Sequence, residues 1–96
     1  MTITVTIEFE AAPGARDALV AKMHEIIPET LGFEGCQRIE FFERDGASGS
    51  LMLFEDWESE AHYAAYKAWR RETGTSVLAS DLVGGPATTT TWNTLR

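Results

Sequence analysis

The chain has 96 residues, of which 15 are Asp or Glu and 8 are Lys or Arg, so its formal net charge is −7. This length suits one domain covering residues 1–96, because most domains run to roughly 100 to 150 residues. The acidic balance argues against nucleic acid and acidic membrane surfaces as partners, since both are bound through clustered Lys and Arg.

The first third of the chain predicts a strand followed by a helix. Residues 2–10 alternate strictly between polar and apolar side chains, and one face consists of Ile3, Val5, Ile7 and Phe9. This is the pattern of a strand with one buried face. Pro13 and Gly14 end the strand. Residues 15–31 then carry apolar side chains at helical spacing, and glycines follow them.

The middle of the chain predicts a β-hairpin and a second helix. Residues 36–44 and 50–57 are rich in aromatic and aliphatic side chains, and the RDGASGS segment between them has the composition of a turn. Ser59 is a suitable N-cap, and Glu60 suits the positive end of a helix dipole. We expect this helix to run to about Glu72.

The last quarter of the chain predicts a short helix and a final strand. Residues 75–83 favour a short third helix, and residues 87–95 favour a strand because their successive threonines are branched at the β-carbon. The order is therefore strand, helix, strand, strand, helix, strand. That order predicts a ferredoxin-like α+β fold, with an antiparallel sheet and helices packed on one face.

The predicted second helix carries the residues of most functional interest. At about 100° per residue, an alanine-rich arc lies opposite Lys67, Arg70 and Arg71, and it consists of Ala61, Ala64, Ala65, Ala68 and Trp69. We expect this arc to pack on the sheet and to leave space, because alanine fills little volume. His62 and Tyr66 lie one turn apart at the edge of the arc. Such a gap suits a small ligand, and plain aromatic core packing explains the same pattern.

Few residues suit metal or nucleotide chemistry. HEIIP at His24 resembles the start of the zinc-protease HExxH motif, but Pro28 stands where the second histidine belongs. One cysteine and two distant histidines do not make a usual zinc set. Nucleophile-elbow, phosphate-loop and dinucleotide motifs are missing from the sequence. We therefore expect no metal and no cofactor, and a solvated His24.

The carboxylates and the single cysteine also suggest ordinary roles. Glu55 and Asp56 point to opposite faces of their strand because strand side chains alternate. They make a poor general acid and base pair, and we expect both to be solvated surface charges. Cys36 follows a tight GFEG turn, and Glu34 and Glu40 nearby disfavour a thiolate. We expect a buried structural thiol rather than a nucleophile.

The order of elements and three motifs together resemble the antibiotic biosynthesis monooxygenase family. The motifs are VTIEFEAAPGARDAL, GFEGCQRIEFFE and LFEDWESEAHYAAYKAW, and the tail GGPATTTTW fits the last strand of the family. The resemblance covers nearly the whole chain. It implies a ferredoxin-like subunit that meets a second copy to close a dimeric α+β barrel, with a pocket between sheet and helices in each subunit.

The resemblance also implies a chemistry. Better studied relatives oxidise polycyclic phenols or quinols with molecular oxygen and without flavin or metal, so we expect a cofactor-independent monooxygenase of a small aromatic phenol or quinol. Trp57 matches the family's tryptophan at the end of its strand. Tyr66 stands nine positions later, where a histidine is common. We assign His62 as the proton acceptor, Tyr66 as the residue that orients the substrate, and Trp57 and Trp69 as apolar walls.

Two other functions stay open at this point. One is a non-catalytic dimeric module that binds a small apolar ligand or plays an accessory part in a pathway. The other is a haem-degrading monooxygenase, which the tyrosine at position 66 disfavours because haem ligation would use the histidine common there.

Size and composition also bear on partners and location. A domain this small gains stability from a partner subunit, so we expect a homodimer. The sequence has neither an apolar run approaching the roughly 20 residues that span a bilayer nor a basic segment followed by a cleavage site. A single cysteine suits a reducing compartment. We expect a cytoplasmic protein.

Overall fold

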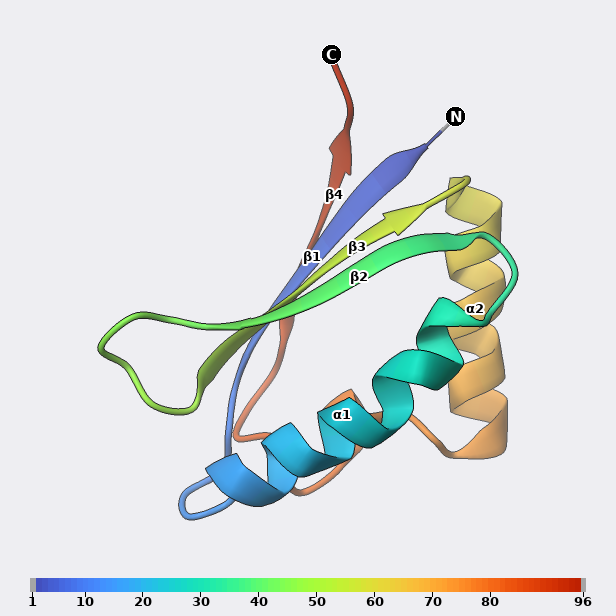
Figure 1. The fold of residues 1–96 in the computed structure, drawn as a ribbon. Helices are drawn as coiled ribbons and strands as arrows, with labels where there is room; N and C mark the ends of the chain where they lie inside the picture. Colours follow the sequence, from blue (N-terminus) through green and yellow to red (C-terminus); the bar gives the residue numbers. More distant parts are fainter. Residues whose placement is uncertain (1, 96) are drawn as a thin grey trace.

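The computed structural model describes residues 2–95 and contains a four-stranded antiparallel sheet with two helices on one face (Figure 1). The strands are β1 (Ile3–Glu10), β2 (Cys36–Glu43), β3 (Ser50–Trp57) and β4 (Thr88–Asn93). They lie side by side in the order β2-β3-β1-β4. Helices connect β1 to β2 and β3 to β4, which confirms the predicted ferredoxin-like α+β fold.

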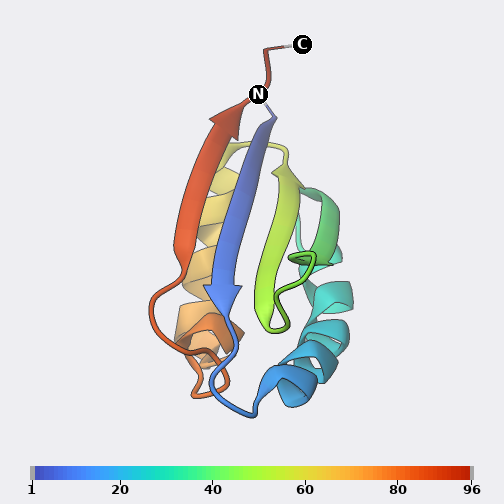
Figure 2. The ribbon, with the colours of Figure 1, turned by 90° about the vertical axis from the view of Figure 1, so that its left-hand side faces the viewer.

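The helices are α1 (Arg16–Leu31) and α2 (Glu60–Thr73), and both lie behind the sheet in Figure 2. Ser59 caps α2 as predicted, because its Oγ accepts a hydrogen bond from the backbone N–H of His62 over 3.2 Å. Gly74 ends α2 in the left-handed conformation at φ +66°. Within residues 2–95, neither helix has the length and apolar character needed to cross a bilayer.

The predicted third helix is only one turn of 3₁₀ helix, Val77–Ala79. The Ser80 hydroxyl donates to the Val77 carbonyl over 2.6 Å, and this local bond competes with continued helix formation. The segment from 74 to 80, which follows α2, is therefore mostly irregular.

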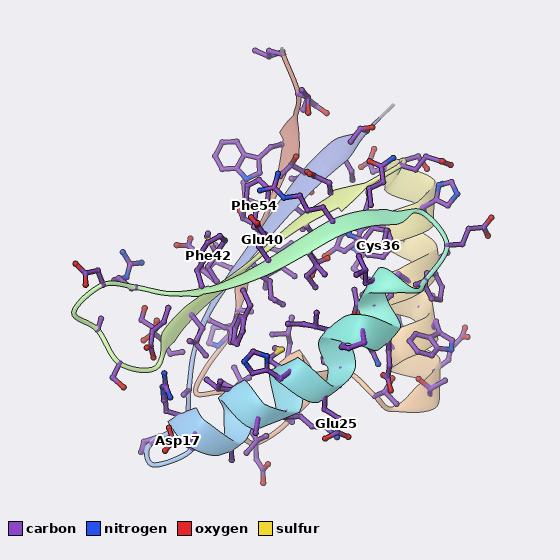
Figure 3. All side chains as sticks on the ribbon, in the orientation of Figure 1. Asp17, Glu25, Cys36, Glu40, Phe42 and Phe54 are labelled. Atoms are coloured by element: carbon purple, nitrogen blue, oxygen red, sulfur yellow. The ribbon has the colours of Figure 1, made fainter. Side chains whose placement is uncertain are left out.

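The core lies between the sheet and the two helices. Alternation along β1 and β3 turns one set of side chains inward, as predicted for β1. Leu19 and Met23 of α1 and Tyr63 of α2 pack against this set, which comprises Ile3, Val5, Ile7, Phe9, Leu51, Leu53 and Trp57. The opposite face of the sheet has no covering helix within residues 2–95, and Phe42 and Phe54 point outward from it (Figure 3).

The expectation that an alanine-rich face of α2 packs on the sheet is wrong. Ala61, Ala64 and Ala65 are exposed, whereas Tyr63 and Arg70 are buried. Tyr63, Tyr66 and Arg70 share one stripe of the helix because they lie three and four positions apart. Their long side chains span the space between helix and sheet, which alanines cannot fill. The buried face of α2 is therefore aromatic and basic.

Candidate active site

A cavity of about 530 Å³ lies between the sheet, the two helices and the segment from 74 to 80. Its volume falls within the range of about 300–1,000 Å³ that is usual for small-molecule sites. Most of its wall is apolar, built by Ile7, Met23, Ile26, Leu53, Val77 and Leu78. The ionisable side chains in the lining are Glu55, Tyr63, Tyr66, Lys67, Arg70 and Arg71.

Glu55 is the acidic residue of this lining, and the expectation that it is a solvated surface charge is wrong. Its side chain is inside the protein, and the residue is only 2% exposed. Strand alternation turns it to the helix side, whereas Asp56 points to the other face and accepts a hydrogen bond from the Thr4 hydroxyl over 2.6 Å. The two neighbours therefore lie on opposite faces, as predicted.

One hydrogen bond, burial and a nearby charge define the state of the Glu55 carboxyl group. Its Oε1 accepts a hydrogen bond from the indole N–H of Trp57 over 2.9 Å. Burial raises the pKa of Glu55 above its ordinary value of 4.5, while the Trp57 hydrogen bond and the charge of Arg70 oppose that rise. Glu55 is also one of the described residues that line the cavity, so its carboxyl group lies within reach of a ligand bound there. Glu55 can therefore exchange a proton with a ligand there.

Tyr66 and Arg70 form a second polar centre in the cavity wall. The Tyr66 hydroxyl accepts a hydrogen bond from Arg70 Nε over 2.9 Å and lies 2.7 Å from the Thr30 hydroxyl. Arg70 also donates to Thr30 Oγ1 over 3.1 Å and to Glu29 Oε1 over 3.0 Å. Arg70 is only 4% exposed, and these bonds compensate for burying its charge. The network connects α2 to α1.

The structure brings three of the four predicted site residues together. The Tyr66 ring centroid lies 5.0 Å from that of Trp57 and 6.3 Å from that of Trp69. Phe33, which the sequence did not single out, packs against all three rings at 5.3 to 6.4 Å. Only Tyr66 of this cluster lines the cavity. Trp57 and Trp69 pack against the Tyr66 ring and do not line the cavity themselves.

His62 lies elsewhere and is not one of the described residues that line the cavity. Its Nδ1 is 2.6 Å from Ser59 Oγ, and its Nε2 is 3.3 Å from the Glu58 carboxylate. These partners hold the ring at the start of α2, against Gly35 in the turn before β2. The structure therefore places His62 outside the cavity lining that includes Tyr66, one helical turn further along α2.

The remaining candidate residues have structural positions. Cys36 is half-buried on the helix side of the sheet, where burial and the charge of Glu55 raise its pKa to about 11, so the group is a neutral thiol at neutral pH. His24 is exposed, as expected. Within residues 2–95 no three His, Cys, Asp or Glu side chains lie close enough together to bind one metal ion.

The family model for antibiotic biosynthesis monooxygenase matches residues 2–73. The chain belongs to the antibiotic biosynthesis monooxygenase family. This confirms the resemblance that the three sequence motifs indicate. A search of curated protein sequences gives no significant match.

Solved structures similar to this member of the family share its whole fold. Rv0793 from Mycobacterium tuberculosis superimposes with a TM-score of 0.85 at 24% identity, covering 100% of this chain and 97% of that one. PA3566 from Pseudomonas aeruginosa gives 0.84 at 17% identity, with 99% and 95% covered. SnoaB, a cofactor-independent oxygenase from Streptomyces nogalater, gives 0.83 at 10% identity, with 99% and 94% covered. At these identities the likeness establishes the fold.

Proposed function

We propose that this protein is a cofactor-independent monooxygenase that oxidises a phenol or quinol with molecular oxygen in the cavity beside α2. The observation that carries the proposal is Glu55, a buried carboxyl group in the wall of a cavity that is mostly apolar. Family membership and the cofactor-independent oxygenase SnoaB among the similar structures support the same chemistry.

The reaction needs no external reductant. A phenol whose keto tautomer carries a CH₂ group loses a proton to Glu55, and the resulting anion transfers an electron to O₂. The radical pair combines to form a carbon–oxygen bond, and the peroxide takes a proton back from Glu55. Loss of the remaining C–H proton then breaks the O–O bond and releases water. In sum, CH₂ and O₂ become C=O and H₂O, so the substrate supplies all four electrons.

The other residues of the site stabilise the anion and exclude water. Arg70 places a positive charge beside the cavity, and preorganised charge of this kind favours the phenolate before it meets oxygen. Tyr66, held by Arg70 and Thr30, orients the substrate oxygen. Trp57 is a positioning residue because its indole fixes the Glu55 carboxylate. Trp69 packs against the Tyr66 ring and does not itself line the cavity.

Glu55 and His62 are competing candidates for the proton acceptor, and the geometry favours Glu55. Glu55 lines the cavity, whereas both ring nitrogens of His62 contact Ser59 and Glu58. A carboxylate with a raised pKa is also a stronger base than an ordinary one.

The test is oxygen uptake by metal-free, flavin-free protein with a panel of tricyclic phenols and their keto tautomers, such as anthrone, in ¹⁸O₂. We expect uptake above the spontaneous rate and one labelled oxygen atom in the product. Glu55→Gln should abolish the enzymatic part, and His62→Gln, as the matched control, should retain it. Unlabelled product, or full activity in Glu55→Gln, would contradict the proposal. Ligand binding without oxygen uptake across the panel would favour the non-catalytic binding module.

We also propose that the protein forms a homodimer through the uncovered face of its sheet. Phe42 and Trp92 on this face are 45% and 54% exposed, and a second copy of the same face would remove both from water. Light scattering should give twice the 10.6 kDa chain mass. Phe42→Glu should shift the sample towards monomer, whereas Glu25→Gln on the exposed side of α1 should leave the mass unchanged.

A further inference from the structure

The basic side chains within residues 2–95 divide into two groups. Arg16, Lys22, Arg38, Arg44 and Arg70 each have a carboxylate oxygen at 2.6 to 3.6 Å. Lys67 and Arg71 form no ion pair with any residue in 2–95, and both line the cavity. In a chain with 15 acidic and 8 basic residues, two unpaired cations at one site leave a local excess of positive charge.

Lys67 and Arg71 lie on neighbouring turns of α2, four positions apart, so their side chains share one stripe of the helix. Both residues are exposed, in contrast to Arg70 between them. Lys67 Nζ lies 4.6 Å from the centroid of the Tyr63 ring, which itself lines the cavity. This cation–π contact holds the ammonium group over the cavity wall. The two cations therefore form a positive rim.

The negative charge of the cavity lies deeper inside the protein than this positive rim. Glu55 is the sole acidic residue among the described residues of the lining, and it is buried in β3. An anionic group on a ligand would be repelled by Glu55 and attracted to Lys67 and Arg71. A hydroxyl group, in contrast, can donate its proton to Glu55. The charges of the cavity thus fix the orientation of a ligand that carries both groups.

We propose that the cavity binds an aromatic hydroxy acid, with its hydroxyl group towards Glu55 and its carboxylate between Lys67 and Arg71. The contact between the ligand hydroxyl and Glu55 rests on the proposed function. The contact between the ligand carboxylate and the two cations is new. Ser76 also lines the cavity from the segment after α2, and its hydroxyl is a further donor for the carboxylate. The positive rim also counteracts the repulsion that a protein of net charge −7 exerts on an approaching anion.

Binding of two matched probes tests this inference without any turnover. The probes are 6-hydroxy-2-naphthoic acid and its methyl ester, which differ in the charge at the end remote from the hydroxyl, and the readout is calorimetry or tryptophan fluorescence. We expect the acid to bind roughly tenfold more tightly at low salt, the size of effect that two exposed charge contacts provide. High salt should reduce this preference because it screens exposed charges.

The double variant Lys67→Gln/Arg71→Gln should bind acid and ester equally well. The matched control is Lys22→Gln/Arg44→Gln, which removes the same two charges from positions outside this cavity and should keep the preference. Equal binding to the unmodified protein, a preference that survives in Lys67→Gln/Arg71→Gln, or no binding of either probe at about 1 mM, the upper end of ordinary substrate affinities, would overturn the inference. Oxygen uptake by Glu55→Gln tests the proposed reaction separately, so the two proposals can fail independently.

Discussion

Trp57 donates its indole N–H to the carboxylate of Glu55 over 2.9 Å, two residues away along the same strand. Both side chains point to the helix side of β3, because residues at positions i and i+2 share a face. The strand thus supplies the buried acid and the donor that fixes it, independently of either helix.

Glu55→Gln should stabilise the protein at neutral pH while greatly slowing turnover. Burial raises the pKa of Glu55 above its ordinary value of 4.5, so the folded state loses stability as the pH rises through the interval between the unfolded and folded pKa values. Glutamine keeps the acceptor for Trp57 and stays neutral. The melting temperature should rise by about 4–8 °C for each 1 kcal/mol gained, and the rate constant should fall by about 10²–10⁴-fold.

Thermal melts of both proteins from pH 4 to pH 8 check this prediction. The stability difference should vanish at the acidic end, where Glu55 is protonated. A difference independent of pH would instead indicate a packing effect of the substitution. A variant less stable than the parent at pH 8 would contradict the buried, desolvated position of Glu55.

Trp57→Phe should shift the pH dependence of kcat/KM. Removing the indole donor withdraws an interaction that lowers the pKa of Glu55, so the acidic limb of the profile should move to higher pH. Trp57 is 0% exposed, and we expect a loss of about 1–3 kcal/mol of stability from the smaller ring. Trp92→Phe is the matched control, since its indole donates to Thr6 on the opposite face of the sheet. A profile that moves equally in both variants would contradict the role of Trp57.

Tyr66→Phe should cost more stability than Tyr63→Phe, although both remove one hydroxyl from the same cavity wall. The Tyr66 hydroxyl is bonded to Arg70 and close to Thr30, and both of these residues are buried. Leaving buried polar groups unpaired costs about 1–3 kcal/mol. The Tyr63 hydroxyl forms no side-chain hydrogen bond within residues 2–95, so its removal should change stability by less than about 0.5 kcal/mol. Urea unfolding of the two variants measures the difference, and equal losses would contradict it.

Gly35→Ala should be more destabilising than Gly46→Ala. Both glycines have positive φ values, +92° and +76°, so alanine at either position adds about 1–2 kcal/mol of backbone strain. At Gly35 a new methyl group would also overlap the His62 side chain, whereas at Gly46 it would meet open space. Urea unfolding should show an excess loss for Gly35→Ala, together with a changed NMR signal of His62. Equal losses of stability in the two variants would mean that the His62 side chain moves aside without cost, and would contradict the prediction.

Much of the fold follows from local patterns in the sequence. Alternation in residues 2–10, the hairpin composition and the Ser59 cap each report a local preference, and β1, β2–β3 and α2 form where these patterns predict. Alternation along β3 also contained the position of Glu55, which lies in phase with the buried residues Leu51, Leu53 and Trp57. The general rule that carboxylates are exposed outweighed this pattern, and the burial of Glu55 was therefore missed.

The burial of Arg70 could not be read from the sequence in the same way. A helical wheel places a basic residue towards solvent unless something pairs with it. The partners of Arg70 on α1 are Glu29 and Thr30, 41 and 40 positions away. Phe33 was missed for a related reason, since a turn residue has no period that reveals its direction. Only the packing of α1 against α2 defines both positions.

The bonds that Arg70 makes to α1 also bear on how the cavity behaves when no ligand is present. If the two helices moved apart, this guanidinium would lose its partners within apolar surroundings, and leaving a buried charge uncompensated costs several kcal/mol. The distance between the helices is therefore set during folding. A ligand of the proposed kind would meet a site whose width is already set, so its affinity would not be reduced by the entropy of closing a loose pocket.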